Sequence, residues 1–278
     1  MNKNKIQLEN LMDFDSDAVI TIGTRVSVDN VSVKTYIDRT LLRNKADFIY
    51  MHPIDDISLQ DKYSQYIKYE AGSEEGVFAL LAFYLIAHST PEYKKYFKDL
   101  DIGYLSGETS VGEEEFEQLV ETLEEKKDIT LIIGEDIYEH ENKKNIINLI
   151  RLIDMYTDMN VVLLGATSQI DLSKSIKIVD VSDINTYNGT VIYTVNVSKK
   201  NPDEDILRGS ASFATAAKIQ DGDIVDVTYN TTTDRKKFVI DPSIRGTIAL
   251  FPKVEGEKEN QIISGYRFKR VQIQKVSV

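Results

Sequence analysis

Cysteine is absent from this chain of 278 residues, and histidine occurs only three times. The lack of cysteine excludes disulfides, cysteine-held iron–sulfur clusters and cysteine-based structural zinc within the chain. His52, His88 and His140 lie in separate segments, without the spacing of metal ligands such as H-E-x-x-H. We therefore predict that the chain holds no metal ion.

The common fingerprints of nucleotide binding and hydrolysis are missing as well. The sequence contains no G-x-G-x-x-G motif, no P-loop pattern and no G-x-S-x-G nucleophile elbow. Covalent catalysis has little support without a cysteine nucleophile or a serine with an evident histidine partner. We predict no catalytic residue in this chain and no cofactor bound by it.

Long apolar runs are scarce. The longest covers residues 77–87 and falls short of the roughly 20 residues that a membrane-spanning helix needs. The polar N-terminal sequence does not resemble a signal peptide. These features predict a cytoplasmic protein without direct membrane insertion.

Positive charge is in deficit. The net charge of −12 and the isoelectric point near 4.8 argue against nucleic acid as a partner. The deficit is uneven: residues 1–172 carry 17 basic and 32 acidic side chains, whereas residues 173–278 carry 16 and 13. Together with the length, this difference predicts two domains, 1–172 and 173–278.

The segment 18–53 organises the first domain. An apolar run at 18–22 ends at Gly23, helical spacing follows Asn30, and a second apolar run ends at His52-Pro53. Parallel strands bind ligands beyond their carboxyl ends, so Gly23, Thr24, Arg25 and His52 are the candidate cofactor-binding residues. A purely structural alternative is that Gly23 makes a turn and that His52 caps the turn before Pro53.

The rest of the first domain repeats this alternation. Further strands are expected at 128–134 and 160–165, and helices are expected at 54–69, 73–87, 92–98, 113–127 and 142–156. The pattern S-x-x-E at 110–113 predicts a capping box for the helix that follows it. The expected fold is α/β, with a Rossmann-like parallel sheet of about four strands and covering helices.

Helical periodicity nearly vanishes in the second domain. Strand-like runs occur at 176–181, 190–197, 224–229, 237–240, 246–250 and 266–276, and one short helix is expected at 212–218. Asn188-Gly189 is a hairpin signal, and 221–223 is a turn. The domain is predicted to be a small β-barrel or sandwich.

An ordered set of motifs resembles a known family. IGTRVSVDN, KADFIYMHPIDD, KYEAGSEEGVFALLAFYLI and LIIGEDIYEHENKKNIINLIRLIDMYTD look like the region that follows the iron–sulfur domains in the G subunit of bacterial respiratory complex I, the NADH–quinone oxidoreductase, in its ε-proteobacterial form. LRGSASFATAAKIQDGDIVDVTYNTTTDRKKFVIDPSIRGTIALFP is similar to the C-terminal β-barrel of the molybdopterin oxidoreductase superfamily, to which that subunit belongs.

The resemblance implies a double-psi-like barrel after the α/β domain, and pterin-contacting loops at Gly23-Thr24 and His52-Pro53. The chain departs from the family where His52 replaces the aspartate of an Asp-Pro loop. It also lacks the cysteine-rich iron–sulfur domains, so the clusters are expected elsewhere in the parent subunit, and this chain looks like a C-terminal fragment or a shortened homologue.

The resemblance therefore implies a non-catalytic scaffold region in the peripheral arm of complex I, on the cytoplasmic side of the inner membrane, with the other peripheral-arm subunits as partners. The alternative is an accessory or pterin- or nucleotide-binding part of a molybdopterin oxidoreductase such as formate dehydrogenase.

Overall fold

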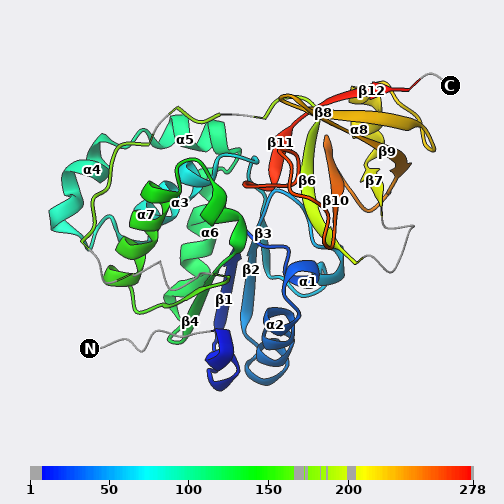
Figure 1. The fold of residues 1–278 in the computed structure, drawn as a ribbon. Coiled ribbons are helices and arrows are strands. Elements are labelled where there is room, and N and C mark those ends of the chain that lie inside the picture. The colour runs from blue at the N-terminus through cyan, green and yellow to red at the C-terminus, as the bar shows by residue number, and fades with distance from the viewer. Residues whose placement is uncertain are drawn as a thin grey trace. The chain divides into compact units, whose positions relative to one another are not determined.

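The computed structural model describes residues 8–165, 172, 175–181, 183–185, 187–198 and 205–276 (Figure 1). The chain divides into two compact units, Met1–Asn185 and Thr186–Val278. Residues 175–181 and 183–185, which follow the sequence-based boundary at 172, therefore belong to the first unit.

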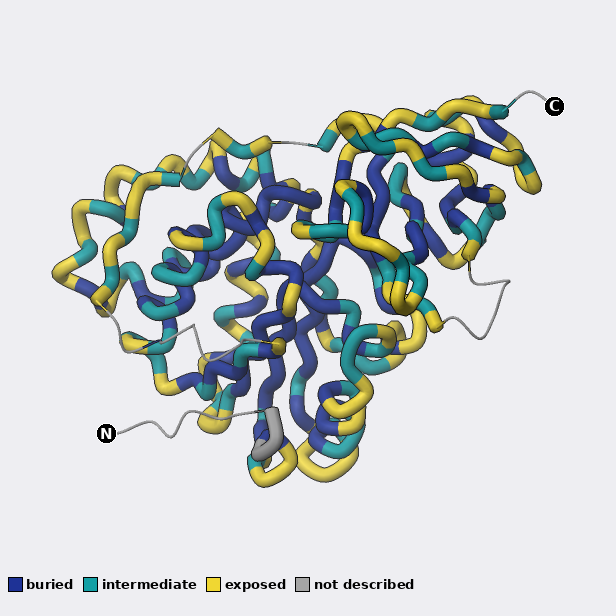
Figure 2. The backbone as a smooth tube through the Cα atoms, in the orientation of Figure 1, coloured by how far each residue is buried: buried dark blue, intermediate teal, exposed yellow. Residues whose placement is uncertain are grey.

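The first unit is built on a five-stranded sheet in the order β3-β2-β1-β4-β5, in which every neighbouring pair is parallel. Its strands are β1 (Ala18–Ile22), β2 (Asp47–Met51), β3 (Gln65–Ile67), β4 (Ile129–Ile133) and β5 (Asn160–Leu163). Figure 2 shows most of this sheet as buried. The predicted α/β class with a parallel sheet is confirmed, with one strand more than expected.

Strand alternation sends successive side chains to two different hydrophobic cores. Ala18, Ile20 and Ile22 face one core, which includes buried side chains of the helices α3 (Glu74–Ile86), α6 (Glu113–Glu124) and α7 (Lys143–Tyr156). Val19 faces the other core, which contains buried residues of α1 (Val26–Asp29) and α2 (Val31–Asn44). The unit thus has three layers, with helices on both faces of the sheet.

The helices follow local signals in most places. Asn30 caps α2 by accepting a hydrogen bond from the Val33 amide at 3.1 Å, as the sequence predicted. The apolar helix α3 lacks a polar face because it packs against α6, α7 and α5 (Ile102–Thr109). The remaining helical elements of this unit are η1 (Leu8–Asp13), η2 (Ile57–Leu59), η3 (Pro91–Tyr93), α4 (Lys94–Asp99) and η4 (Glu135–Glu139).

Three local predictions for this unit are wrong. Residues 54–69 form η2 and β3 rather than a helix, because the main chain of β3 pairs with β2 and extends the sheet by one strand. Ser110 does not open a capping box: it ends α5 in the left-handed region at φ 56°, and Gly112 precedes α6. Residues 176–181 form no strand.

The second unit contains a mixed sheet in the order β11-β6-β10-β7-β9-β8-β12 and one helix, α8 (Ala211–Ala217). The sheet looks curled in Figure 1. Its strands are β6 (Val191–Val197), β7 (Ile206–Gly209), β8 (Ile224–Tyr229), β9 (Thr232–Ile240), β10 (Ile248–Val254), β11 (Phe268–Arg270) and β12 (Gln272–Lys275). The described pairings leave β11 and β12 as edges, so the double-psi-like barrel stays a prediction.

Two features of the second unit differ from the sequence-based expectation. Asn188-Gly189 does not make a hairpin, because it leads into β6, whose neighbours are the distant strands β10 and β11. Strand β7 was not predicted. The turn at 221–223 is confirmed, and Gly222 adopts φ +84° there. None of the helices in the described part of the chain has both the length and the apolar character needed to cross a bilayer.

A pair of glycine substitutions tests the tight contact between the ends of β1 and β4. A Cβ on Gly134 would lie 1.9 Å from the Gly23 carbonyl oxygen, which is fixed main chain. Gly134→Ala should therefore lower the free energy of unfolding by more than about 3 kcal/mol. Gly107→Ala, in α5 with open space around the new Cβ, should raise it by about 0.5–1 kcal/mol. Urea denaturation measures both, and equal effects would contradict the geometry.

Candidate functional site

The carboxyl edge of the five-stranded sheet has a topological switch point between β1 and β4. The chain runs from β1 to β2 on one side of β1 and later returns as β4 on the other side. In open α/β sheets such a point usually opens a ligand crevice. Gly23–Arg25 follow β1, His52 follows β2, and Gly134 follows β4, so the sequence placed its candidates at this edge correctly.

Main chain fills the space between the ends of β1 and β4. The Gly134 amide donates to the Ile22 carbonyl at 2.7 Å, and the Asp136 amide donates to the Gly23 carbonyl at 3.2 Å. Gly23 turns the chain with φ +72°, a conformation that suits glycine. The segment η4 is thus hydrogen-bonded directly onto the loop after β1, where a ligand would otherwise enter.

His52 is wholly buried and joins this edge through both ring nitrogens. Its Nδ1 lies 3.0 Å from the Ile54 amide and 3.0 Å from the Ile54 carbonyl. A main-chain amide N–H can only donate, so we assign Nδ1 as the acceptor of the Ile54 N–H. Nε2 then carries the proton and donates to Asp136 Oδ2 at 3.3 Å, and Asp136 is 1% exposed.

Aromatic rings surround His52. The Tyr50 ring stacks on the imidazole with centroids 5.9 Å apart and planes 18° apart. The Tyr66 hydroxyl donates to the His52 carbonyl at 3.0 Å. Burial is the main cause that raises the pKa of Tyr50 well above its usual value, with the charge of Asp56 contributing, so this phenol stays neutral. The ring environment fixes the imidazole in one orientation.

A second buried histidine–carboxylate pair lies in the same unit. His140 Nε2 is 3.1 Å from the Gly72 carbonyl and 3.4 Å from Glu74 Oε2, and both side chains are at most 2% exposed. Burial raises the pKa of Tyr69 strongly, followed by the charges of Glu74 and Asp136.

The loop after β1 is tied to the loop after β2. Asp56 accepts hydrogen bonds from the Ser27 amide at 2.9 Å and from the Ser27 hydroxyl at 2.5 Å. Thr24 is 2% exposed, and the Arg25 amide donates to Asp29 at 3.0 Å. Arg25 Nε is buried and has no hydrogen-bond partner among the described residues. Arg25 therefore keeps a hydrogen-bond donor that its described surroundings do not use.

Sequence reasoning singled out the segment 52–56, which contains Asp56, but it missed Asp136 and Glu74. A weak signal existed for Asp136, because an acidic residue two positions after a strand-ending glycine lies at the carboxyl edge. Glu74 was assigned to the first turn of a helix, where a carboxylate is usual, but it is fully buried. Nothing in the local sequence pairs either carboxylate with its histidine.

The chemistry open to this arrangement is limited. Both buried imidazoles are engaged with main-chain groups and carboxylates, and neither is accessible to a substrate in solvent. Within the described ranges, no group of three or more His, Cys, Asp or Glu side chains is arranged to hold a metal ion. The polar side chains at this edge of the sheet therefore serve to hydrogen-bond one loop to another.

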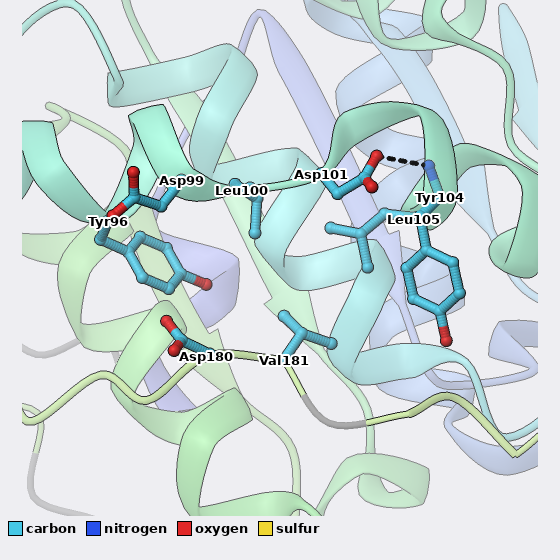
Figure 3. A pocket seen from close by; sticks show the side chains of 8 residues that line it. All are labelled: Tyr96, Asp99, Leu100, Asp101, Tyr104, Leu105, Asp180 and Val181. Atoms are coloured by element: carbon cyan, nitrogen blue, oxygen red, sulfur yellow. Dashed lines mark hydrogen bonds between the residues drawn. The ribbon is translucent and has the colours of Figure 1, made fainter.

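A separate cavity of about 150 Å³ lies beside α4, α5 and residues 180–181 (Figure 3). Leu100, Leu105 and Val181 line it, and the Tyr96 ring extends toward Asp180. The Tyr96 hydroxyl is buried without a hydrogen-bond partner in the described part of the chain. Burial, together with the charges of Glu75 and Asp180, raises the pKa of Tyr96, so the hydroxyl stays protonated.

No family model and no curated protein matches this chain. Among solved structures, it is similar to acetylene hydratase from Pelobacter acetylenicus, with 12% sequence identity and a TM-score of 0.39. The similarity covers 52% of this chain and 22% of the hydratase chain. Such values mark a distant likeness of fold, and the assignment to the G subunit of complex I stays a prediction.

A double-mutant cycle tests the buried pair that joins β2 to β4. His52→Ala and Asp136→Ala should each lower the free energy of unfolding by about 3 kcal/mol, because each leaves a buried polar partner unsatisfied. The double variant should lose less than the sum of the two, by about 1–3 kcal/mol, in urea denaturation. His88→Ala, at an exposed histidine, should be nearly neutral. Additive losses at 52 and 136 would mean that the pair is not coupled.

Proposed function

We propose that this chain is a non-catalytic scaffold region of an NADH–quinone oxidoreductase, of the type of the G subunit in the peripheral arm of respiratory complex I. It would position neighbouring subunits for electron transfer to quinone. The observation that carries the proposal is the internal use of the strand-end site: His52 is fully buried against Asp136, and η4 lies on the loop after β1.

The family resemblance implies that these loops bind a pterin cofactor in catalytic relatives. Here their polar groups bond to one another instead. Asp56 accepts from Ser27, and the Gly134 amide donates to Ile22. A ligand that entered here would have to break several of these hydrogen bonds, and each buried group left unpaired costs about 1–3 kcal/mol. This cost supports a structural role.

The expected partners are the other subunits of the peripheral arm. The iron–sulfur clusters would lie in another part of the parent subunit, and the complex would hold the chain on the cytoplasmic side of the inner membrane. The acidic side chains of the first turn of α6, Glu113, Glu114 and Glu115, are half-buried or exposed, as expected of a surface that contacts solvent or a basic partner.

The second candidate is an accessory or pterin- or nucleotide-binding part of a molybdopterin oxidoreductase such as formate dehydrogenase. The buried Arg25 Nε without a hydrogen-bond partner among the described residues favours it, because a phosphate could accept from that nitrogen. A thermal shift assay with guanosine diphosphate and pterin guanine dinucleotide tests this alternative, since a ligand that binds the native state raises the apparent melting temperature. A rise that Arg25→Gln abolishes would favour the alternative over the scaffold.

The scaffold proposal predicts a specific set of partners. An affinity-tagged chain, expressed from its own locus and purified from gently solubilised membranes, should recover NADH–quinone oxidoreductase subunits in fixed ratio. An untagged strain, processed in parallel, is the control for adherent protein. Recovery of a molybdenum-containing catalytic subunit would contradict the proposal, as would stoichiometric iron in the isolated chain.

A further inference from the structure

The second unit contains a cavity of about 540 Å³, a volume within the range of small-molecule sites. It is lined by the turn after β8, by the segment before β6, and by the junction of β11 and β12. The lining residues that offer polar side chains are Thr190, Thr228, Tyr229, Asn230, Arg270 and Gln272. The lining includes a guanidinium and two amides but no carboxylate, so its chemistry favours an anion.

Arg270 is the cation of this lining. Its side chain is exposed, and it makes no side-chain hydrogen bond or ion pair with the described residues. Arg270 Nε lies 4.0 Å from the position that a Cβ on Gly189 would take, so the guanidinium stem runs past that glycine. A guanidinium with unused donors can form two parallel hydrogen bonds to a carboxylate or a phosphate.

The preceding residue, Lys269, is buried and contacts Tyr229, one of the residues that line the cavity. Lys269 is 5% exposed, and its ammonium donates to the Tyr266 carbonyl at 2.5 Å. The same ammonium lies 5.7 Å from the ring centroid of Tyr229, which lines the cavity. Burial, and then the charge of Lys253, lower the pKa of Lys269 to about 8.

Lys236, which is buried to a similar extent in the same unit, differs from Lys269 in having carboxylate partners. It is 6% exposed, and its ammonium contacts Asp205 at 2.7 Å and Asp234 at 3.0 Å. Within the described residues, no carboxylate lies within 4.0 Å of the Lys269 ammonium. Buried charges are normally paired, so an ammonium that has no carboxylate partner and contacts a cavity-lining ring leaves positive charge that an anion would neutralise.

We propose that this cavity binds a small organic anion through a phosphate or carboxylate group held by Arg270, with the amides of Asn230 and Gln272 available to hydrogen-bond the rest of the molecule. Lys269, which contacts the Tyr229 ring but does not line the cavity, strengthens the attraction without touching the ligand. The site belongs to the second unit alone and does not depend on the scaffold role proposed for the chain.

The test uses the full-length chain with two probes, inorganic pyrophosphate and tricarballylate, in isothermal titration at low salt. At least one probe should bind saturably, with a dissociation constant below about 1 mM. Binding of pyrophosphate alone assigns a phosphate ligand, and binding of tricarballylate alone assigns a carboxylate. The absence of saturable binding by both probes would overturn the proposal.

Variants locate the binding. Arg270→Gln should weaken it at least tenfold, whereas Arg245→Gln, which removes the same charge from an exposed position of the same unit outside the cavity, should change it less than twofold. Equal losses in the two variants would mean general charge attraction and would overturn the site. Arg270→Lys keeps the charge and should still weaken binding, because it loses the paired hydrogen bonds.

The pKa of Lys269, followed by NMR in the unaltered protein, provides a test that does not depend on the Arg270 variants. Bound pyrophosphate should raise the pKa of Lys269 above about 8, because a nearby negative charge favours the ammonium form. Nitrogen-15 NMR of the lysine side chains measures this change in the unaltered protein. Saturating probe that leaves the pKa of Lys269 unmoved would show that the anion binds elsewhere.

Discussion

The contact between the carboxyl ends of β1 and β4 is the constraint on which the first unit depends. Two glycines permit it: Gly23 turns the chain, and Gly134 comes so close that any side chain would meet the Gly23 carbonyl. The hydrogen bonds from Gly134 and Asp136 then set the path of η4 across the strand ends. This path brings the Asp136 carboxylate to His52, which lies 84 residues earlier in the chain.

The buried polar residues at this edge lower the stability of the fold unless they are paired, since removing a charged group from water costs several kcal/mol that only good hydrogen bonds offset. Here each of them connects loops that leave different strands. His52 joins the loops after β2 and β4, Asp56 joins those after β1 and β2, and His140 joins η4 to the start of α3. Such connections fix the loops in one arrangement, as a scaffold requires and as an open ligand crevice does not.

The sequence predicted correctly those elements whose formation depends on residues close together in the chain. The apolar run of β1 and the Asn30 cap of α2 are examples, because each depends on neighbours within a few residues. Strand β3 escaped prediction because it has only three residues, and the tyrosines around it have spacing that also suits a helix. The edge of the sheet, rather than intrinsic propensity, makes those residues a strand.

At the candidate site as well, the features that depend on neighbouring residues were predictable, and those that depend on residues far away in the sequence were not. The position of His52 at a strand end was predictable from the apolar run before His52-Pro53. Its burial was not, because that depends on Asp136, on the Tyr50 ring and on the path of η4. In the second unit, the burial of Lys269 was likewise invisible in the sequence, because the Tyr229 ring reaches it only in the fold.

The hydrogen bonds of the strand-end site close it to ligands and hold the His52 ring in one arrangement. Nitrogen-15 NMR of the histidine rings measures this directly. We expect a single tautomer at His52, in which Nδ1 accepts from the Ile54 amide and the proton on Nε2 exchanges slowly with water, and rapid exchange for the exposed His88. A mixture of tautomers at His52, or exchange as fast as at His88, would contradict a closed site.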